Sequence, residues 1–307
     1  MKNSLKIAFI LHGKLKQVDK IKKRITAVFN KGFDVSFRST NLDNGAKNET
    51  KEAIEANADF VIIAGGDGSI NEMVNGYMAT SEKLRNHVVL GVLPMGTGND
   101  FARSIKVRND LNELRAMIED QSFINVDIGL VKFENLSGKT DQRYFINIID
   151  IGIGGNVVED LAKGRKFSNP NLTYTKAIVS SFLKYKKRHV ELKSKSYTWS
   201  GKILSLCMAN GKYFGSGICI APDACVNDGK IELTIMGNLS LWDYIRNLSK
   251  IRKGEKLVHD EITYTTIEAC SIQAPISCPI DMDGEFIGHT PLEMKVLNNS
   301  VRVIGRQ

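Results

Sequence analysis

The sequence predicts an α/β protein in which an N-terminal doubly wound, Rossmann-like domain is followed by a mainly β sandwich domain. Three observations carry this prediction. Over the first 125 residues, short apolar runs alternate with segments of helical periodicity, the pattern of parallel βαβ units. After Phe123, β-branched and alternating segments separated by turn signals take over. The length of 307 residues fits two domains of about 150 residues each.

Four short apolar or β-branched runs are the predicted parallel strands of the first domain. Their residues are 5–11, 34–38, 60–64 and 88–92. Helical spacing or helix-forming composition predicts helices at 18–29, 46–58, 70–78, 111–120 and around Asp100. A doubly wound sheet binds its ligand beyond the carboxyl ends of the strands, so the loops that leave these strands are the expected site.

The second domain is predicted from five further strand-like segments. These are residues 123–131, 144–151, 202–208, 230–236 and 262–272. Turn signals separate them, namely Ser137-Gly138, Ser200-Gly201, Asn227-Asp228-Gly229 and Asp283-Gly284. We therefore expect a first domain over 1–124 and a second over 125–293. We also expect the C-terminal tail, from about residue 294 to 307, to pack back onto the first domain.

Charge and composition narrow the class of protein. The net charge is +8, from 42 basic and 34 acidic residues, which favours an anionic partner such as a nucleotide, a nucleic acid or a membrane surface. No helix-turn-helix or aromatic platform supports nucleic acid, so we expect none to bind. The apolar runs are much shorter than the about 20 residues of a spanning helix. With no secretory leader in the first residues, we expect a cytoplasmic protein.

The first glycine-rich loop lies between the predicted strand 60–64 and the predicted helix 70–78. It reads Gly65-Gly66-Asp67-Gly68-Ser69-Ile70-Asn71-Glu72. Glycines permit a tight turn and a close approach to a ligand, and free N–H groups at a helix start attract a phosphate. A carboxylate there would repel the phosphate unless a cation lies between them, so Asp67 implies Mg²⁺. The alternative is a tight turn, capped by Ser69, that binds no ligand.

A second loop repeats this order of strand, glycine-rich turn and helix. After the strand 88–92 the chain continues Leu93-Pro94-Met95-Gly96-Thr97-Gly98-Asn99-Asp100-Phe101-Ala102-Arg103. Thr97 can donate to a phosphate, Asp100 can support a metal ion, and Arg103 can pair with either. Each loop alone fits an ordinary turn, whereas two loops converging from adjacent strands predict nucleotide binding. The Walker A pattern and the dinucleotide fingerprint are both absent.

These two loops resemble those of the diacylglycerol kinase catalytic-domain family, and most closely its soluble bacterial lipid kinase branch. The similarity continues in order through Val126-Asp127-Ile128-Gly129, Asn147 with Gly152, Ala221-Pro222-Asp223, Asn227-Asp228-Gly229 and Asp283-Gly284-Glu285. It therefore spans nearly the whole chain. One departure is the exit from the first strand, Leu11-His12-Gly13-Lys14, where family members often have an Asn-Pro turn with a Ser-Gly.

The resemblance implies an ATP- and Mg²⁺-dependent kinase that phosphorylates the hydroxyl of diacylglycerol or a related lipid alcohol, giving a phosphatidic-acid-like product. It implies that the loop 65–72, Gly96 and Thr97 bind the ATP phosphates and that Thr40 touches the nucleotide. The catalytic roles that it implies are a Mg²⁺-placing network of Asp67, Asp100 and Asp127, steadied by Arg103, with Glu285 as acceptor of the lipid hydroxyl proton.

The resemblance also implies a structural Mg²⁺ at Asp228, assisted by the backbone carbonyls of Cys225 and Lys230. From residue chemistry alone, two plainer interpretations stay open. Glu285 fits a solvated carboxylate at a hairpin tip, and Asp228 fits an ordinary Asn-Asp-Gly turn.

A basic stretch suggests how the protein meets its substrate. Residues 161–190 contain no acid and eight cations. Tyr174, Ile178, Phe182 and Tyr185 recur there at helical spacing. Such a helix suits anionic phospholipid head groups, although a core-facing helix with a solvated end is the alternative. We therefore expect peripheral association with the inner face of the membrane, where the lipid substrate lies.

Two other functions share part of this pattern. NAD kinases and phosphofructokinases also carry Gly-Gly-Asp-Gly, but the second loop fits lipid kinases and neither of these. A nucleotide-sensing module without turnover is the third candidate, and the acids present in both loops favour turnover over sensing. The sequence leaves open whether the chain forms a homodimer.

Overall fold

The computed structural model describes most of the chain. The described residues are 4–41, 45–163 and 185–306. Within them, no helix is both long and apolar enough to cross a membrane.

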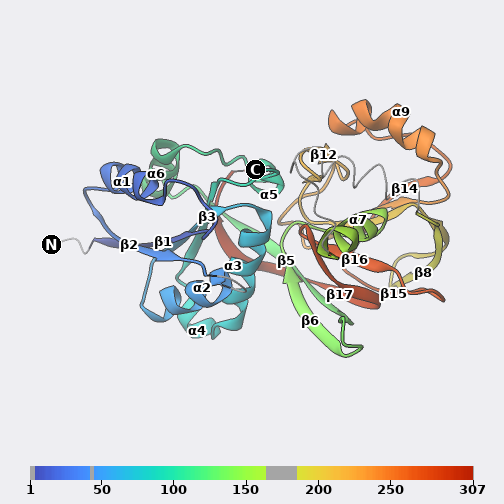
Figure 1. Ribbon diagram of the computed structural model, residues 1–307, viewed down its shortest axis with the longest axis horizontal. Helices are drawn as coiled ribbons and strands as arrows, with labels where there is room; N and C mark the ends of the chain where they lie inside the picture. The colour runs from blue at the N-terminus through green and yellow to red at the C-terminus, as the bar shows by residue number, and fades with distance from the viewer. Residues whose placement is uncertain (1–3, 42–44, 164–184, 307) are drawn as a thin grey trace. The chain divides into compact units, whose positions relative to one another are not determined.

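The chain divides into two compact units. Unit 1 comprises Met1–Ile128 and Asn299–Gln307, and unit 2 comprises Gly129–Asn298. Two strands run from one unit into the other, β5 (Phe123–Glu134) and β17 (Glu285–Ile304) (Figure 1). The divisions lie a few residues beyond the boundaries expected from the sequence.

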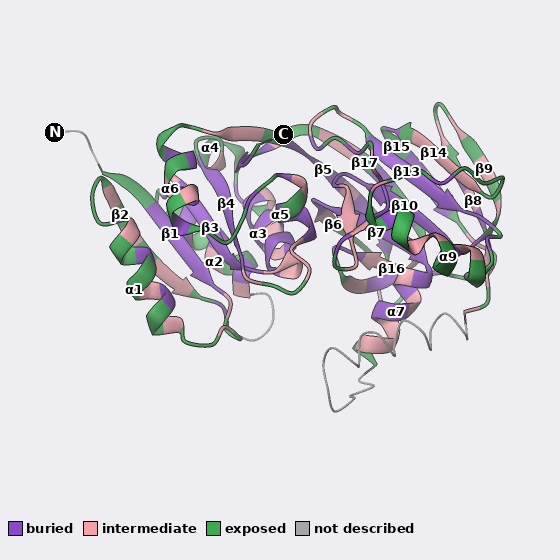
Figure 2. Ribbon diagram, turned by 90° about the horizontal axis from the view of Figure 1, so that it is seen from above, coloured by how far each residue is buried: buried purple, intermediate pink, exposed green. Residues whose placement is uncertain are grey.

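Unit 1 is the expected doubly wound α/β domain. Its sheet has the order β2-β1-β3-β4, followed by the end of β17, and every pair is parallel. The strands are β1 (Leu5–Leu11), β2 (Phe33–Ser39), β3 (Phe60–Gly65) and β4 (Val89–Pro94). Every residue of β3 and β4 is buried, which explains why these strands read as continuous apolar runs (Figure 2).

Helices pack on both faces of this sheet. They are α1 (Val18–Val28), α2 (Gly45–Glu55), α3 (Asp67–Ala79), α4 (Glu82–Arg85), α5 (Asp100–Ser104) and α6 (Leu111–Glu119). Helices α1 and α6 lie together on one face, and α2 and α3 lie together on the other (Figure 1). The C-terminal residues belong to this unit, where the Gly305 N–H donates to the Ser122 carbonyl and the Arg306 N–H donates to the Ile105 carbonyl.

Unit 2 is a β sandwich built from two antiparallel sheets that share β17. One sheet has the order β14-β13-β10-β7-β16-β17, and the other β9-β8-β15-β17-β5-β6. The strands are β6 (Thr140–Phe145), β7 (Ile148–Gly152), β8 (Arg188–Ser194), β9 (Thr198–Ile203), β10 (Ser205–Ala209), β13 (Ile231–Met236), β14 (Ile262–Ile267), β15 (Ala269–Gln273) and β16 (Pro279–Met282). A short hairpin pairs β11 (Tyr213–Phe214) with β12 (Ile218–Cys219).

Three segments predicted as single strands are each two strands, so that part of the prediction is wrong. The segment 144–151 divides between β6 and β7, 202–208 between β9 and β10, and 262–272 between β14 and β15. At each break the chain passes from one sheet to the other. The corner takes only one or two residues and carries no glycine or proline signal, so the apolar pattern continues across it.

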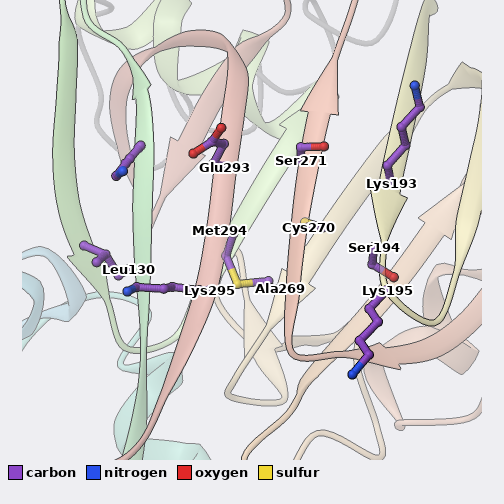
Figure 3. Close-up of a pocket in the computed structure, with 11 residues that line it drawn as sticks. Leu130, Lys193, Ser194, Lys195, Ala269, Cys270, Ser271, Glu293, Met294 and Lys295 are labelled. Carbon is purple, nitrogen blue, oxygen red and sulfur yellow. The ribbon is translucent and has the colours of Figure 1, made fainter.

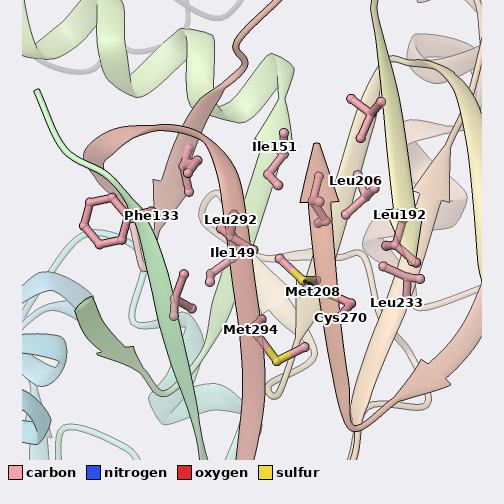
Figure 4. Packing of buried hydrophobic residues seen from close by; sticks show 14 of the residues in the cluster. Phe133, Ile149, Ile151, Leu192, Leu206, Met208, Leu233, Cys270, Leu292 and Met294 are labelled. Atoms are coloured by element: carbon pink, nitrogen blue, oxygen red, sulfur yellow. Dashed lines mark hydrogen bonds between the residues drawn. The ribbon is translucent and has the colours of Figure 1, made fainter. Parts of the chain in front are cut away.

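The inward faces of both sheets form the main core of unit 2. Side chains such as Phe133, Ile149, Leu206 and Met294 pack together there and are buried (Figure 4). A second apolar cluster involves helix α9 (Leu241–Arg252), which contributes Tyr244 and Ile251. Helix α7 (Ile153–Ala162) lies along β7 and β16.

Candidate functional site

The two glycine-rich loops leave the carboxyl edge of the unit 1 sheet side by side. Gly65, the last residue of β3, is in register with Pro94, the last residue of β4. The ends of β1 and β2 lie at the same edge, because Leu11 is in register with both Ala64 and Ser39. The predicted convergence of the two loops is therefore present in the structure.

The two loops touch through their backbones. The Met95 N–H donates to the Gly65 carbonyl at 2.9 Å. A Cβ added to Gly96 would lie 2.4 Å from the Gly66 Cα atom, a distance that no real side chain tolerates. Glycine is therefore required at this contact, and the backbones of the two loops form one continuous surface.

Two carboxylates converge on the second loop. A Cβ placed on Gly98 would lie 3.1 Å from Oδ2 of Asp67 and 3.1 Å from Oδ2 of Asp100. The other oxygen of Asp67, Oδ1, accepts the backbone N–H of Phe101 at 3.1 Å, which fixes the carboxylate against the start of α5. Oxygen donors brought together in this way fit a hard cation, and Mg²⁺ is commonly held by one or two carboxylates together with substrate phosphates.

The rest of the first loop is built into helix α3. This helix begins at Asp67, so Gly68 and Ser69 lie in its first turn, whereas a helix from residue 70 was predicted. Ser69, Ile70 and Asn71 are buried, and the Ile70 side chain is part of the apolar core.

Glu72 has a structural partner that the sequence did not indicate. Its Oε2 atom accepts the N–H of Ala46 in the first turn of α2, at 2.9 Å. Because Ala46 lies 26 residues away, only the fold brings the two together. Glu72 thus ties α2 to α3, and its predicted role in nucleotide binding stays a prediction.

Thr40 stands at the same edge as the loops and is buried. Its hydroxyl oxygen accepts the N–H of Gly13 at 2.9 Å, and a Cβ on Gly13 would lie 2.3 Å from the Thr40 carbonyl oxygen. The atypical Leu11-His12-Gly13-Lys14 exit is therefore closely packed against Thr40. Thr97 and Arg103 are exposed, as side chains that reach a ligand in solution need to be.

Asp127 is fully buried at the point where β5 leaves unit 1. Its Oδ1 atom accepts the N–H of Asn299 at 2.6 Å. Asn299 has a positive φ of 48°, so this bond also fixes a strained residue of β17. Asp127 therefore links the two strands that cross between the units, whereas its predicted part in a Mg²⁺ network remains a prediction.

In unit 2, Glu285 follows a tight hairpin turn between β16 and β17. Asp283 and Gly284 both have positive φ values, 50° and 90°, as a two-residue type I′ hairpin requires. The Glu285 side chain is 43% exposed, and its Oε2 lies 3.7 Å from the Arg143 guanidinium. The turn thus presents a carboxylate to solvent, which both the hairpin-tip interpretation and a proton-accepting role require.

Asp283 anchors this turn and was missed as a functional residue. Its carboxylate accepts three successive backbone N–H groups, from Ile146 at 3.0 Å, Asn147 at 3.1 Å and Ile148 at 2.8 Å. These donors lie at the corner between β6 and β7, which is why the predicted strand 144–151 breaks there. The only hint in the sequence is the Asp-Gly pair itself.

A second pair of acids lies beneath the turn. Asp281 and Asp150 face each other across β16 and β7, and Asp281 accepts the N–H of Gly284 at 2.9 Å. Burial, followed by the neighbouring Asp150, raises the pKa of Asp281 well above its ordinary value. Burial also raises the pKa of Asp150, opposed by hydrogen bonds from Ser205, Cys207 and the Gly154 N–H.

The predicted structural metal site lies in an exposed turn of unit 2. Asp228 Oδ1 accepts the Lys230 N–H at 3.0 Å, and the Cys225 thiol donates to the Asn227 side chain at 3.2 Å. Among the described residues, no group of three or more His, Cys, Asp or Glu side chains is placed to hold a metal ion. Mg²⁺ at Asp228 stays a prediction. The predicted basic helix falls largely on residues 164–184, outside the described residues.

A separate hollow lies on the exposed face of the second sheet in unit 2 (Figure 3). The small residues Ala269 and Ser271 of β15 lie between Lys193 and Lys195 on one side and Lys295 on the other. None of the predicted site residues lines it.

A parallel α/β domain with paired glycine loops, followed along the chain by a β sandwich, is the arrangement that two family models cover together. Residues 6–131 match the model of the diacylglycerol kinase catalytic domain. Residues 147–305 match that of the YegS C-terminal NAD kinase beta sandwich-like domain. The chain belongs to the diacylglycerol kinase catalytic-domain family, in its YegS-like bacterial form.

Relatives agree with this placement along nearly the whole chain. The chain is 28% identical to a diacylglycerol kinase of Bacillus subtilis over 305 residues, covering 98% of this chain and 96% of that one. It is 27% identical to a diacylglycerol kinase of Staphylococcus carnosus, covering 89% and 85%.

Solved structures show the same fold. A diacylglycerol kinase from Bacillus anthracis superposes with a TM-score of 0.72 at 19% identity, covering 100% of this chain and 98% of that one. Yeast NADH kinase complexed with NADH superposes with a TM-score of 0.53 at 9% identity, covering 98% and 83%. The predicted α/β class with a β-rich second domain is confirmed.

Proposed function

We propose that this protein is a lipid kinase that uses ATP and Mg²⁺ to phosphorylate the hydroxyl of diacylglycerol or a related lipid alcohol. The product is a phosphatidic-acid-like lipid. The observation that carries the chemistry is the convergence of the Asp67 and Asp100 carboxylates on Gly98, within two glycine loops that touch through their backbones. Family membership supports the choice of a lipid as acceptor.

The residues at the sheet edge have the chemistry that phosphoryl transfer needs. Backbone N–H groups of the loops and the exposed Thr97 hydroxyl bind the ATP phosphates. Asp67 and Asp100 would hold Mg²⁺, which would neutralise negative charge on the transferring phosphoryl group. The exposed Arg103 side chain supplies a further positive charge. The two oxygens of Asp67 have different roles. Oδ1 accepts the Phe101 N–H, and Oδ2, which is directed at Gly98, is the one proposed to bind the cation.

Glu285 is the proposed proton acceptor for the lipid hydroxyl. Its carboxylate is solvent-accessible, as an approaching substrate requires, and its turn is anchored by Asp283. A carboxylate beside the attacking hydroxyl can orient it and take its proton as the new P–O bond forms.

A mixed-micelle assay with labelled ATP tests this function. Diacylglycerol, other lipid alcohols and NAD serve as acceptors, each with Mg²⁺ and with the metal chelated. We expect labelled phosphate on a lipid, dependent on Mg²⁺, and none on NAD. Transfer to NAD alone would support an NAD kinase instead, and ATP binding without transfer to any acceptor would support a nucleotide sensor.

A further inference from the structure

Helix α9 of unit 2 has two faces of different character. At 100° per residue, Trp242, Ile245, Arg246, Ser249 and Lys253 fall on one side of it, in the i, i+3, i+4, i+7, i+11 pattern. All five are exposed, and we call this stripe the α9 outer face.

The opposite side of α9 fixes the helix to the domain. Tyr244 and Ile251 are buried in the second apolar cluster of unit 2, and Leu248 packs against it. Ser240 caps the first turn, since its hydroxyl oxygen accepts the Asp243 N–H at 3.1 Å. The α9 outer face is thus carried on a helix that is already packed, capped and formed without a partner.

Two apolar residues of the α9 outer face, Trp242 and Ile245, are exposed one helical turn apart. Trp242 is 79% exposed and Ile245 is 50% exposed. By contrast Trp199, the other tryptophan of the chain, packs against the main core of unit 2. A large aromatic ring and an aliphatic side chain exposed next to each other on one helix face form a contiguous apolar patch, which is typical of an interaction surface.

The charges around Trp242 and Ile245 indicate that the partner of this surface is anionic. Helix α9 and its C-cap carry Arg246, Lys250, Arg252 and Lys253. Within the described residues, none of these four cations is in an ion pair. Asp243 is the only acid of the helix, and its carboxylate accepts the Ser240 hydroxyl as part of the N-terminal cap.

We propose that the α9 outer face binds the surface of an anionic lipid bilayer, with Trp242 and Ile245 inserted at head-group depth. Tryptophan prefers this depth because its ring is apolar and its N–H is polar. Cations flanking the inserted residues meet the phosphates of anionic lipids. The proposal adds a docking surface to the proposed function, and binding can be measured without any catalytic turnover.

Tryptophan fluorescence tests the insertion directly. In a Trp199→Phe variant of the full chain, Trp242 is the only tryptophan. With vesicles of phosphatidylglycerol and phosphatidylcholine, we expect its emission to shift to the blue and to be quenched by lipids brominated near the head groups. Emission that stays unchanged while the protein co-sediments with the vesicles would overturn the proposal.

Paired substitutions test the energetics in a vesicle co-sedimentation assay. We expect Trp242→Ala with Ile245→Ala, and separately Arg246→Ala with Lys250→Ala, to weaken vesicle binding by at least about tenfold. The matched control removes two exposed cations elsewhere in unit 2, Lys132→Ala with Lys202→Ala, and should weaken it less than threefold. If vesicle binding weakened equally in all variants, including the control, binding would depend only on overall charge and the proposal would be wrong.

Two further readouts separate this proposal from its competitors. If Trp242→Ala abolishes a dimer in analytical ultracentrifugation and leaves vesicle binding intact, the α9 outer face is a protein interface and the proposal is wrong. Kinase activity on short-chain diacylglycerol dispersed in neutral detergent should survive the α9 substitutions. Vesicle binding without kinase activity in the parent protein would reject the proposed function and leave the docking surface standing.

Discussion

The acids of the glycine loops and the acids around the Asp-Gly-Glu turn are held in opposite ways. In unit 1, Asp67 gives one oxygen to a backbone N–H and directs the other toward Gly98, where Asp100 directs one as well. In unit 2, both oxygens of Asp283 are occupied by the protein's own backbone donors. The first arrangement suits a cation and the second fixes the shape of a turn, so similar carboxylates have different purposes.

The exposed carboxylate of unit 2 should give the largest effect on activity. We expect Glu285→Gln to lower kcat by about 10²–10⁴-fold, because an amide cannot accept the lipid hydroxyl proton. The melting temperature should hardly change, since the ion pair with Arg143 is half-exposed and weak. Micelle kinetics and thermal melts on one preparation check both parts. A near-normal kcat would mean that Glu285 does not accept the proton and is only a solvated carboxylate next to the hairpin turn.

The glycine-loop acids should affect turnover and not the fold. We expect Asp67→Asn to lower kcat by about 10²–10³-fold while the amide oxygen still accepts the Phe101 N–H. The apparent Mg²⁺ requirement should rise in a metal titration. The control is Asp34→Asn, which removes an equal charge at an exposed position of β2 and should leave kinetics unchanged. A variant with normal Mg²⁺ dependence would mean that Asp67 serves only to hold the start of α5 through the Phe101 N–H.

Substitution of Asp283, the buried anchor of the turn in unit 2, should have the opposite effect to substitution of Asp67. It should lower the stability of the fold, and turnover should fall as a consequence. Asp283→Ala leaves three buried N–H groups without their acceptor, at about 1–3 kcal/mol each. We expect a clear fall in melting temperature and, because the turn carrying Glu285 loses its anchor, a lower kcat. Asp283→Asn keeps one acceptor oxygen and tolerates the positive φ. Its melting temperature and kcat should therefore lie between those of the parent protein and those of Asp283→Ala. An Ala variant as stable as the parent would contradict the anchoring role.

The smallest predicted effect is a pH-dependent gain in stability. The pKa of Asp281 is raised in the fold, so the folded state holds more protons than the unfolded chain. The free energy of unfolding therefore falls as pH rises from about 4, the unfolded pKa, through the folded pKa. Asp281→Asn removes the charge and can still accept the Gly284 N–H. We expect a higher melting temperature at pH 8, by about 2–4 °C for each kcal/mol regained, and no gain at pH 4. An equal gain at both pH values would contradict it.

The sequence predicted most of unit 1 because its signals are local. Buried parallel strands read as apolar runs, and glycines mark the loops that follow them. In unit 2, three strand predictions failed for one reason. The sandwich corners at Asn147, Leu204 and Glu268 need no turn residue, so the sequence does not show where one strand ends and the next begins. The partners of Glu72 and Asp283 were missed for a related reason. Each carboxylate binds backbone groups far away along the chain, and an N–H donor has no signature in sequence.

Asp127 and its bond to Asn299 have a consequence for how the chain unfolds. The bond lies where both connecting strands enter unit 1, and β17 continues from there to pair with β4. Unfolding of either unit would remove strands that pair with β17, which pairs with β4 in unit 1 and with β15 and β16 in unit 2. Such a shared strand couples the two folding units thermodynamically, so heat should melt them in one cooperative step. Cleavage of the backbone near residue 298 would remove the part of this coupling that β17 carries and should make the transition less cooperative.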